Sequence, residues 1–200
     1  MNAPAADVEN PAIYGTVNPM IFELGDIVEI FIDNHDFNNH PFHLHGHNFQ
    51  VVDRSSGGAN FPGISSPYPT SPMRRDTIMV YGGGYAVIRF QVTSPGVNLF
   101  HCHIEWHVEA GLTATFIEAA PQLQAQKLYL PDSHRDACNK QKILMKGNAA
   151  GNYKNYLDLT GANVEPGLEN WGLVLSLFLL LLRGSLDANF EDSALINPPS

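Results

Sequence analysis

Histidines are concentrated in two short stretches of the sequence. Seven of the nine lie in HPFHLHGH, from His40 to His47, and in HCHIEWH, from His101 to His107, which also contains Cys102. Neutral imidazoles beside a thiolate are ligands for a borderline-soft transition metal, copper above all. Histidines that are merely packed or solvated would not explain spacings of two residues, which match a strand. The two stretches therefore predict copper binding.

Residue spacing divides these side chains into two sets, because successive side chains of a strand point to opposite faces of the sheet. In NLFHCH, His101 and His103 are expected on one face and Cys102 on the other. His107 follows a turn of IEW and can return to the Cys102 side. Two metal sites joined through one strand are therefore predicted.

The first stretch follows the same rule. His43 and His45 are two residues apart and share a face, whereas His40 precedes Pro41, which stiffens the backbone there. A thiolate with two imidazoles is the trigonal set of a blue electron-transfer copper. The ligands expected for that ion are His40, Cys102 and His107. The remaining histidines of the two stretches are expected to line another copper site: His43, His45, His101 and His103.

The elements that must position these residues are predicted to be β-strands between Met20 and Glu118. GDIVEIFIDN alternates apolar and charged residues, as in a half-buried strand that ends at a turn. DTIMVY and YAVIRFQVT continue the pattern, and the glycines at 82–84 between them predict a hairpin. VNLFHCH and LTATFIEA bracket a segment that is long enough for one helical turn. Short strands at this spacing predict an all-β, antiparallel sandwich.

Residue composition indicates what kind of segment each remaining part of the chain forms. The stretch from Arg54 to Arg75 is rich in Gly, Pro and Ser and is predicted to be a surface loop. Beyond Pro121, QLQAQKLYL predicts a short helix, and the polar residues that follow have no sustained period, as in a tail. Five segments are expected: an N-terminal extension (1–12), the sandwich domain (13–130), a polar tail (131–170), a short apolar segment (171–183) and a polar C-terminus (184–200).

The apolar segment WGLVLSLFLLLL, Trp171 to Leu182, has two interpretations. Its length as a helix is about 18 Å, which falls short of the roughly 30 Å hydrocarbon core of a membrane and favours a buried or interfacial helix. A leucine-rich run after a long polar tail, however, has no domain nearby to bury it. A shortened membrane anchor is therefore the alternative.

Charge, the N-terminus and the cysteines narrow the classes of function. A formal net charge of −9 leaves no basic stripe for phosphates and argues against nucleic acid as a partner. MNAPAADVEN lacks the basic start and apolar region of a signal peptide, so no export signal is expected in this chain. Cys138 is expected to be either a buried free thiol or one half of a disulfide whose other half lies outside this sequence.

Both histidine stretches resemble the two C-terminal copper signatures of multicopper oxidases, a family that includes laccases, ferroxidases and ascorbate oxidase. The resemblance extends from about Ile13 to Asn163 and implies the third cupredoxin domain of such an enzyme, a Greek-key β-sandwich. It implies copper as the cofactor. In this family's pattern the ligands are His40, Cys102 and His107 for type 1 copper, His43 for type 2 copper, and His45, His101 and His103 for the type 3 pair.

The same resemblance places Leu112, ten residues after Cys102, at the axial position of type 1 copper. Leucine cannot ligate, so a three-coordinate ion with a raised potential is expected, which suits an oxidant. An ordinary core residue of the last strand is an equally compatible interpretation. His47 is not a family ligand and is expected to pack or hydrogen-bond nearby, and His35 and His134 are expected to be solvated.

The flanking sequence resembles fungal iron-transport ferroxidases more than secreted phenol-oxidising laccases, in AIYG, IVEI, PMRRDT, GNAAGN and DLTGANV. In those ferroxidases an aspartate four residues before the first type 1 histidine binds Fe(II), and Asp36 has that position before His40. From composition alone, Asp36 is as well explained as a turn residue. The catalytic residues implied by the resemblance are Asp36, His40, Cys102 and His103.

The resemblance also implies partners outside this sequence. The trinuclear cluster of the family is shared between the first and third domains, so this chain would hold type 1 copper fully and type 2 and type 3 copper only in part. The longer enzyme is expected to oxidise Fe(II) with O2 for high-affinity iron uptake, beside an iron permease, at the cell surface, in the plasma membrane or outside the cell. Its tail cysteine would bridge to the first domain. The alternatives are a laccase-like phenol oxidase and a stand-alone copper-binding cupredoxin fragment without oxidase activity.

Overall fold

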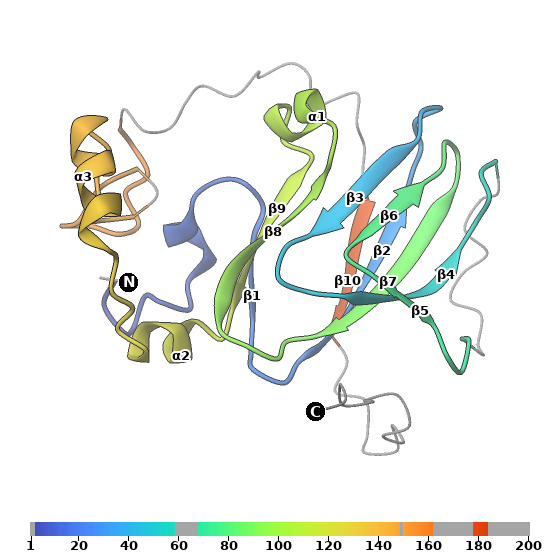
Figure 1. Cartoon of the computed structure of the whole chain (residues 1–200), viewed down its shortest axis with the longest axis horizontal. Coiled ribbons are helices and arrows are strands. Elements are labelled where there is room, and N and C mark those ends of the chain that lie inside the picture. Colours follow the sequence, from blue (N-terminus) through green and yellow to red (C-terminus); the bar gives the residue numbers. More distant parts are fainter. Residues whose placement is uncertain (1–2, 59–67, 149, 162–177, 184–200) are drawn as a thin grey trace.

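Two β-sheets make up most of the computed structural model, which describes residues 3–58, 68–148 and 150–161 together with the backbone of 178–183 (Figure 1). The first sheet has the order β1-β9-β8-β3-β6. Its strands are β1 (Pro19–Phe22), β9 (Thr113–Glu118), β8 (Gly96–Cys102), β3 (His40–Leu44) and β6 (Thr77–Val80). The second sheet has the order β10-β2-β7-β4-β5. Its strands are β10 (Phe178–Arg183), β2 (Ile27–Asp33), β7 (Tyr85–Gln91), β4 (Phe49–Arg54) and β5 (Met73–Arg75).

The core lies between the two sheets and confirms the predicted sandwich. On β2, Val28, Ile30 and Ile32 are buried while the residues between them are partly exposed, which is the alternation expected of a strand with one apolar face. Phe100 on β8 and Phe116 on β9 stack in the same core, with ring centroids 5.7 Å apart. The pairing is antiparallel except between β1 and β9, which run parallel.

The hairpin predicted around residues 82–84 is wrong. β6 pairs with β3 in the first sheet and β7 pairs with β2 and β4 in the second, so the connection between β6 and β7 crosses from one sheet to the other. The turn is real, because the amide of Gly84 donates to the carbonyl of Tyr81 (3.0 Å). Alternation and glycines predict a turn, but they do not specify which sheet the next strand enters.

This crossing turn is packed directly against the segment that precedes β3. The amide of Gly83 donates to the carbonyl of Asp36 (2.9 Å), and the amide of Gly82 donates to Oδ1 of Asn39 (3.0 Å). A Cβ atom at Gly82 would overlap the backbone carbonyl of Phe37. Only glycine therefore permits the two backbones to approach this closely.

The region predicted as a surface loop, Arg54 to Arg75, contains a strand at its end. β5 pairs antiparallel with β4, in the register of Phe49 with Arg75. Residues 59–67 of the predicted loop lie outside the described part of the chain. The exposed edge strand is short and polar, a combination that gives little periodicity to detect in the sequence.

The described residues include four short helical segments: the 3-10 helix η1 (Pro11–Tyr14) and the α-helices α1 (Glu105–Glu109), α2 (Ala120–Ala125) and α3 (Asp132–Lys140). α1 confirms the helical turn predicted after β8. The helix predicted for QLQAQKLYL is confirmed only in its first residues, because α2 begins at Ala120 and ends at Ala125. Figure 1 shows α2, α3 and the N-terminal segment together beside β1, away from the second sheet.

The polar tail differs from the predicted unstructured linker, because it contains α3 and a turn organised by Asn148. The Nδ2 group of Asn148 donates to the carbonyls of Tyr156 (2.9 Å) and Asp158 (2.6 Å). Its Oδ1 accepts from the amides of Ala150 (3.0 Å) and Asn152 (2.9 Å). Asparagine side chains can satisfy backbone groups in this way without any apolar period, which explains why the sequence pattern missed it.

Replacing Asn148 with alanine should therefore lower the free energy of unfolding by about 2 kcal/mol, because four hydrogen bonds are lost at roughly 0.5–1.5 kcal/mol each, partly replaced by water. Urea unfolding followed by fluorescence measures the change. Asn139→Ala, at an exposed position of α3, is the matched control and should unfold like the parent chain. Equal stability of the two variants would contradict this role for Asn148.

The apolar segment also differs from expectation. Residues 178–183 form β10, which pairs antiparallel with β2 from Phe178 opposite Asp33 to Arg183 opposite Val28, whereas a helix was predicted. Leucine is a good helix former, but tertiary context routinely overrides intrinsic propensity. Here the pairing of β10 with β2 satisfies the backbone groups along the edge of β2. The rest of the segment, 171–177, lies outside the described residues. Within the part of the chain that the structure describes, no helix is both long and apolar enough to cross a membrane.

Candidate metal centre

Three side chains from β3, β8 and α1 converge at one end of the first sheet. The Nδ1 atoms of His40 and His107 lie 3.6 and 3.4 Å from Sγ of Cys102. The ligand atoms of all three residues lie within 4.8 Å of one another. His40 and Cys102 are fully buried, and His107 is partly exposed. Two imidazole nitrogens and one sulfur therefore face a common point, as the spacing predicted.

Strand register and one short helix bring these residues together. β3 and β8 pair with Phe42 opposite Cys102, so Cys102 lies close to the start of β3 where His40 is located. The chain then turns through α1, and the amide of Leu112 donates to the carbonyl of His107 (2.8 Å). The amide of Cys102 in turn donates to the carbonyl of Leu112 (3.1 Å). These bonds fold His107 back over the strand that carries Cys102.

Burial favours the uncharged forms of Cys102 and His107. Desolvation raises the pKa of the Cys102 thiol, although a hydrogen bond involving the backbone of Ile104 opposes it. Desolvation also lowers the pKa of His107, and the nearby His40 lowers it further. Neutral imidazoles keep the lone pair that a metal requires, and a bound cation replaces the proton of a buried thiol. The donor set therefore fits a thiolate-binding copper ion.

The other four histidines gather on the opposite face of the same strands. Nε2 of His45 lies 2.9 Å from Nε2 of His101. The ring centroids are 4.8 Å apart for His43 and His45, and 5.4 Å apart for His101 and His103. Desolvation lowers the pKa of His45, and the three neighbouring imidazoles lower it further. The structure therefore brings together the second set that strand alternation predicted.

Backbone carbonyls orient two of these rings. Nδ1 of His43 lies 2.9 Å from the carbonyl of Asp76, and Nδ1 of His101 lies 2.9 Å from the carbonyl of Cys102. A carbonyl only accepts, so Nδ1 carries the hydrogen in both rings and Nε2 keeps its lone pair. Imidazoles that ligate metals are commonly oriented by such contacts. Nε2 is therefore the atom that each of the two rings keeps as an electron-pair donor.

Asp36 connects the buried His40 ring to the protein surface. Oδ2 of Asp36 lies 3.0 Å from Nε2 of His40, and the Asp36 side chain is 20% exposed while that of His40 is fully buried. Burial raises the pKa of Asp36, but hydrogen bonds from His40, Asn38 and Phe37 outweigh it and leave the pKa below its usual value. Asp36 is therefore a surface carboxylate that stays ionised next to a predicted metal ligand.

The other residues considered in the sequence contribute no side chain to either cluster. Leu112 is buried in the apolar core that also contains Cys102. His35 is exposed and pairs with Asp33 (3.1 Å), and His134 is exposed on α3. Cys138 is a partly exposed free thiol on α3, which differs from the buried state predicted for a free thiol.

One buried acidic residue was not identified from the sequence. Glu118 at the end of β9 is fully buried, and its Oε2 lies 2.7 Å from Nε2 of His47. Sequence alternation marked Glu118 only as the last residue of a strand. His47 was the one histidine of the first stretch without a predicted ligand role. It was therefore the sequence feature that could have indicated a polar partner of this kind.

Comparison with known proteins decides the family. The multicopper oxidase family model matches residues 1–122, more than half of the chain. The chain belongs to the multicopper oxidase family. Membership in this family implies copper as the metal of the clusters, and it identifies the two-sheet sandwich as cupredoxin-like.

Individual multicopper oxidases resemble the chain over most of its length. The iron transport multicopper oxidase fetC of Epichloe festucae is 46% identical over 184 residues, which cover 84% of this chain and 29% of that protein. The iron transport multicopper oxidase fio1 of Schizosaccharomyces pombe is 48% identical over 78% of this chain and 25% of that protein. The chain therefore spans less than a third of the length of these relatives.

Solved structures of multicopper oxidases also resemble the chain. The crystal structure of Fet3p, a multicopper oxidase that functions in iron import, matches with a TM-score of 0.67 and 40% identity, over 80% of this chain and 32% of that one. A mutant of the laccase from B. aclada matches with a TM-score of 0.52 and 27% identity, over 74% of this chain and 26% of that one. The chain thus resembles the iron-import oxidase more closely than this laccase.

Proposed function

We propose that the chain is the C-terminal copper-binding part of a fungal ferroxidase, which oxidises Fe(II) to Fe(III) and reduces O2 to water. The observation that carries this proposal is the 3.0 Å contact between the ionised Asp36 and His40, a member of the thiolate-imidazole cluster. Four Fe(II) ions each give one electron, and O2 with four protons becomes two water molecules. Similarity to iron-transport oxidases supports iron as the electron donor.

The copper ligands are assigned from the two clusters. Copper supplies a one-electron acceptor at the thiolate cluster and a site for O2 reduction at the histidine cluster. We assign His40, Cys102 and His107 to type 1 copper, His43 to type 2 copper, and His45, His101 and His103 to the type 3 pair. Cys102 lies between His101 and His103 in the sequence, so one dipeptide links the two sites. That link gives His103 its proposed role in passing electrons.

Asp36 is proposed to bind the ferrous substrate. A carboxylate is a hard oxygen ligand, so it stabilises Fe(III) over Fe(II) and makes iron easier to oxidise. The contact from Asp36 to His40 then leads the electron into the buried thiolate cluster. The low pKa of Asp36 keeps it charged for cation binding at neutral pH.

The rest of the enzyme is proposed to come from chain outside these 200 residues. Relatives are more than three times as long as the part that this chain matches, and the histidine cluster carries only some of the imidazoles that three copper ions require. We propose that N-terminal cupredoxin domains supply the other ligands, and that the whole enzyme acts at the cell surface beside an iron permease. A bridge from Cys138 to another domain belongs to the same proposal.

Removing the Asp36 carboxylate tests the iron assignment. In the full-length enzyme, Asp36→Ala should lower kcat/KM for Fe(II) by at least about tenfold, corresponding to roughly 1.4 kcal/mol of lost transition-state stabilisation, while sparing oxidation of a small phenol. The two rates are measured by oxygen uptake on the same preparation.

Asp33→Ala is the matched control, because Asp33 is also a partly exposed carboxylate beside a histidine but contacts the exposed His35. It should keep both activities. Equal losses on Fe(II) and phenol in Asp36→Ala would favour the laccase-like alternative, which the structural match to a laccase also supports.

A further inference from the structure

A buried polar network joins the turn after β3 to the end of β9. Nε2–H of His47 donates to Oε2 of Glu118 (2.7 Å), and Nδ2 of Asn98 donates to Oε1 of the same carboxylate (3.0 Å). The Glu118 side chain is fully buried, and that of His47 is 6% exposed. A buried carboxylate is costly unless both oxygens are paired, and here both are. None of the three residues belongs to the proposed copper ligands.

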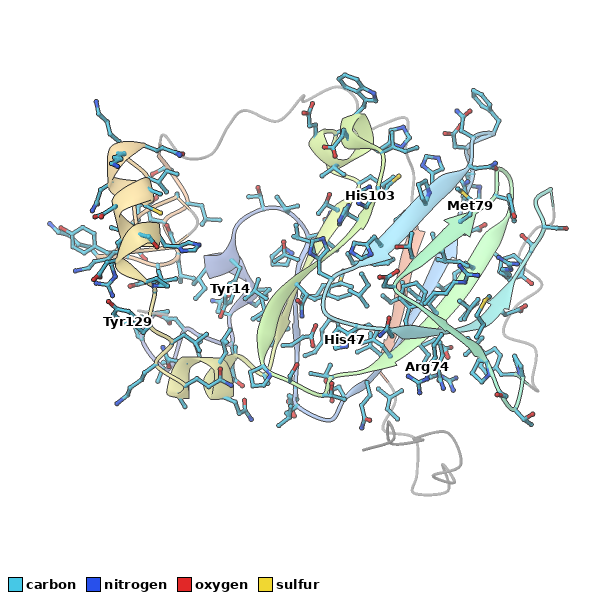
Figure 2. All side chains as sticks on the ribbon, in the orientation of Figure 1. Tyr14, His47, Arg74, Met79, His103 and Tyr129 are labelled. Atoms are coloured by element: carbon cyan, nitrogen blue, oxygen red, sulfur yellow. The ribbon has the colours of Figure 1, made fainter. Side chains whose placement is uncertain are left out.

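The His47 ring is held between the two sheets. Its centroid lies 4.6 Å from that of Phe90 on β7, and Phe90 stacks on Phe116 of β9 at 6.0 Å. Figure 2 shows His47 well separated from His103, which lies near α1. Packing on one side and a carboxylate on the other leave the ring a single orientation.

The turn itself lies directly on β8. The amide of His45 donates to the carbonyl of Leu99 (2.9 Å). Gly46 has φ +75°, and a Cβ atom there would lie 2.7 Å from Oδ1 of Asn98. The residue before Gly46 thus points toward His101, and the residue after it points toward Glu118. Because only one residue separates the two histidines, a shift of this backbone turn would displace both imidazoles.

We propose that His47, Glu118 and Asn98 are positioning residues that hold this turn on β8 and thereby fix the His45 imidazole beside His101. The inference rests on the proposed function, which assigns those two imidazoles to the type 3 copper pair. The network touches neither copper nor substrate and acts only through the turn.

Copper binding to the histidine cluster tests the proposal. The 200-residue chain carrying Cys102→Ser and His107→Ala loses two of the three ligands of the thiolate cluster, so calorimetric titration with Cu(II) reports the histidine cluster. In that background, His47→Leu should raise the Kd at least about tenfold, as loss of an orienting partner commonly does. Glu118→Gln keeps an oxygen that can accept from His47, so its Kd for Cu(II) should stay within about threefold of the parent value. His134→Leu, an exposed histidine on α3, should bind like its parent.

The blue absorption separates a positioning role from general damage to the fold. In the chain with Cys102 intact, His47→Leu should keep the blue absorption, because the network does not contact His40, Cys102 or His107. If His47→Leu lost both the blue band and copper binding at the histidine cluster, the proposal would be overturned, since the loss of both would indicate general unfolding. Unchanged Cu(II) affinity in His47→Leu would overturn it as well.

A metal-free measurement decides the proposal even if copper does not bind. In a crystal structure of metal-free Glu118→Leu, the Nε2 atoms of His45 and His101, 2.9 Å apart here, should move beyond hydrogen-bonding distance. An unchanged distance would overturn the inference. Absence of a blue band in the unmodified chain would instead count against the proposed function alone.

Discussion

Replacing Cys102 with serine should abolish the blue absorption of the copper-loaded chain and weaken copper binding at the thiolate cluster by on the order of 100-fold or more, since even partners that only orient a ligand contribute 10–100-fold. Serine is too short and too weakly acidic to replace a thiolate, so His40 and His107 would be left as a two-nitrogen site. Visible absorption and copper titration of the purified chain measure both effects.

Cys138→Ser is the matched control for that experiment. Cys138 is the other free cysteine of the described residues, and it lies on α3, away from the cluster. The control should keep both the blue colour and the affinity. A blue Cys102→Ser chain, or a colourless Cys138→Ser chain, would show that the ligand has been assigned incorrectly.

A second large effect is expected from Gly82→Ala. The added methyl group would overlap the backbone of Phe37, so the crossing turn and the segment that carries Asp36 cannot both keep their positions. The free energy of unfolding should fall by about 3 kcal/mol, the upper end of the range for overpacking. Because Asp36 must also move relative to His40, kcat/KM for Fe(II) in the full-length enzyme should fall with it. Urea unfolding and iron oxidation measure the two losses.

Gly25→Ala provides the control for Gly82→Ala. A Cβ atom at Gly25 meets nothing within 4 Å, although its φ of +94° is unfavourable for alanine. The cost should be limited to about 1–2 kcal/mol of backbone strain, with iron oxidation unchanged. Retention of normal iron oxidation in Gly82→Ala would contradict the coupling between the crossing turn and Asp36.

Local periodicity predicted which histidine and cysteine side chains lie together. The alternation of a strand is a property of neighbouring residues, so the opposite faces of Cys102 and His101 could be deduced before any fold was known. The return of His107 followed from the length of the turn between β8 and β9. Asp36 was different, because its position relative to His40 came from resemblance and not from any local pattern.

Features that depend on distant residues could not be predicted. Glu118 contacts His47 across 71 residues of sequence, and nothing near either residue indicates the other. The glycines at 82–84 predicted a turn correctly but not the change of sheet, which is decided by the pairing partners of β6 and β7. Residues 178–183 formed a strand because β2 offered an open edge, an environment that leucine content does not reveal.

The parallel pair of β1 and β9 has a practical consequence for producing the protein. β1 is the outermost strand of its sheet, and the segment before it is tied to α2, where Nε2 of Gln124 donates to the carbonyl of Ala3 (2.6 Å). A shortened version that begins after Phe22 would retain every histidine of both clusters. It would also leave the apolar strand β9 with an open edge, a template for aggregation. Soluble material for copper studies therefore depends on about twenty residues that carry none of the chemistry.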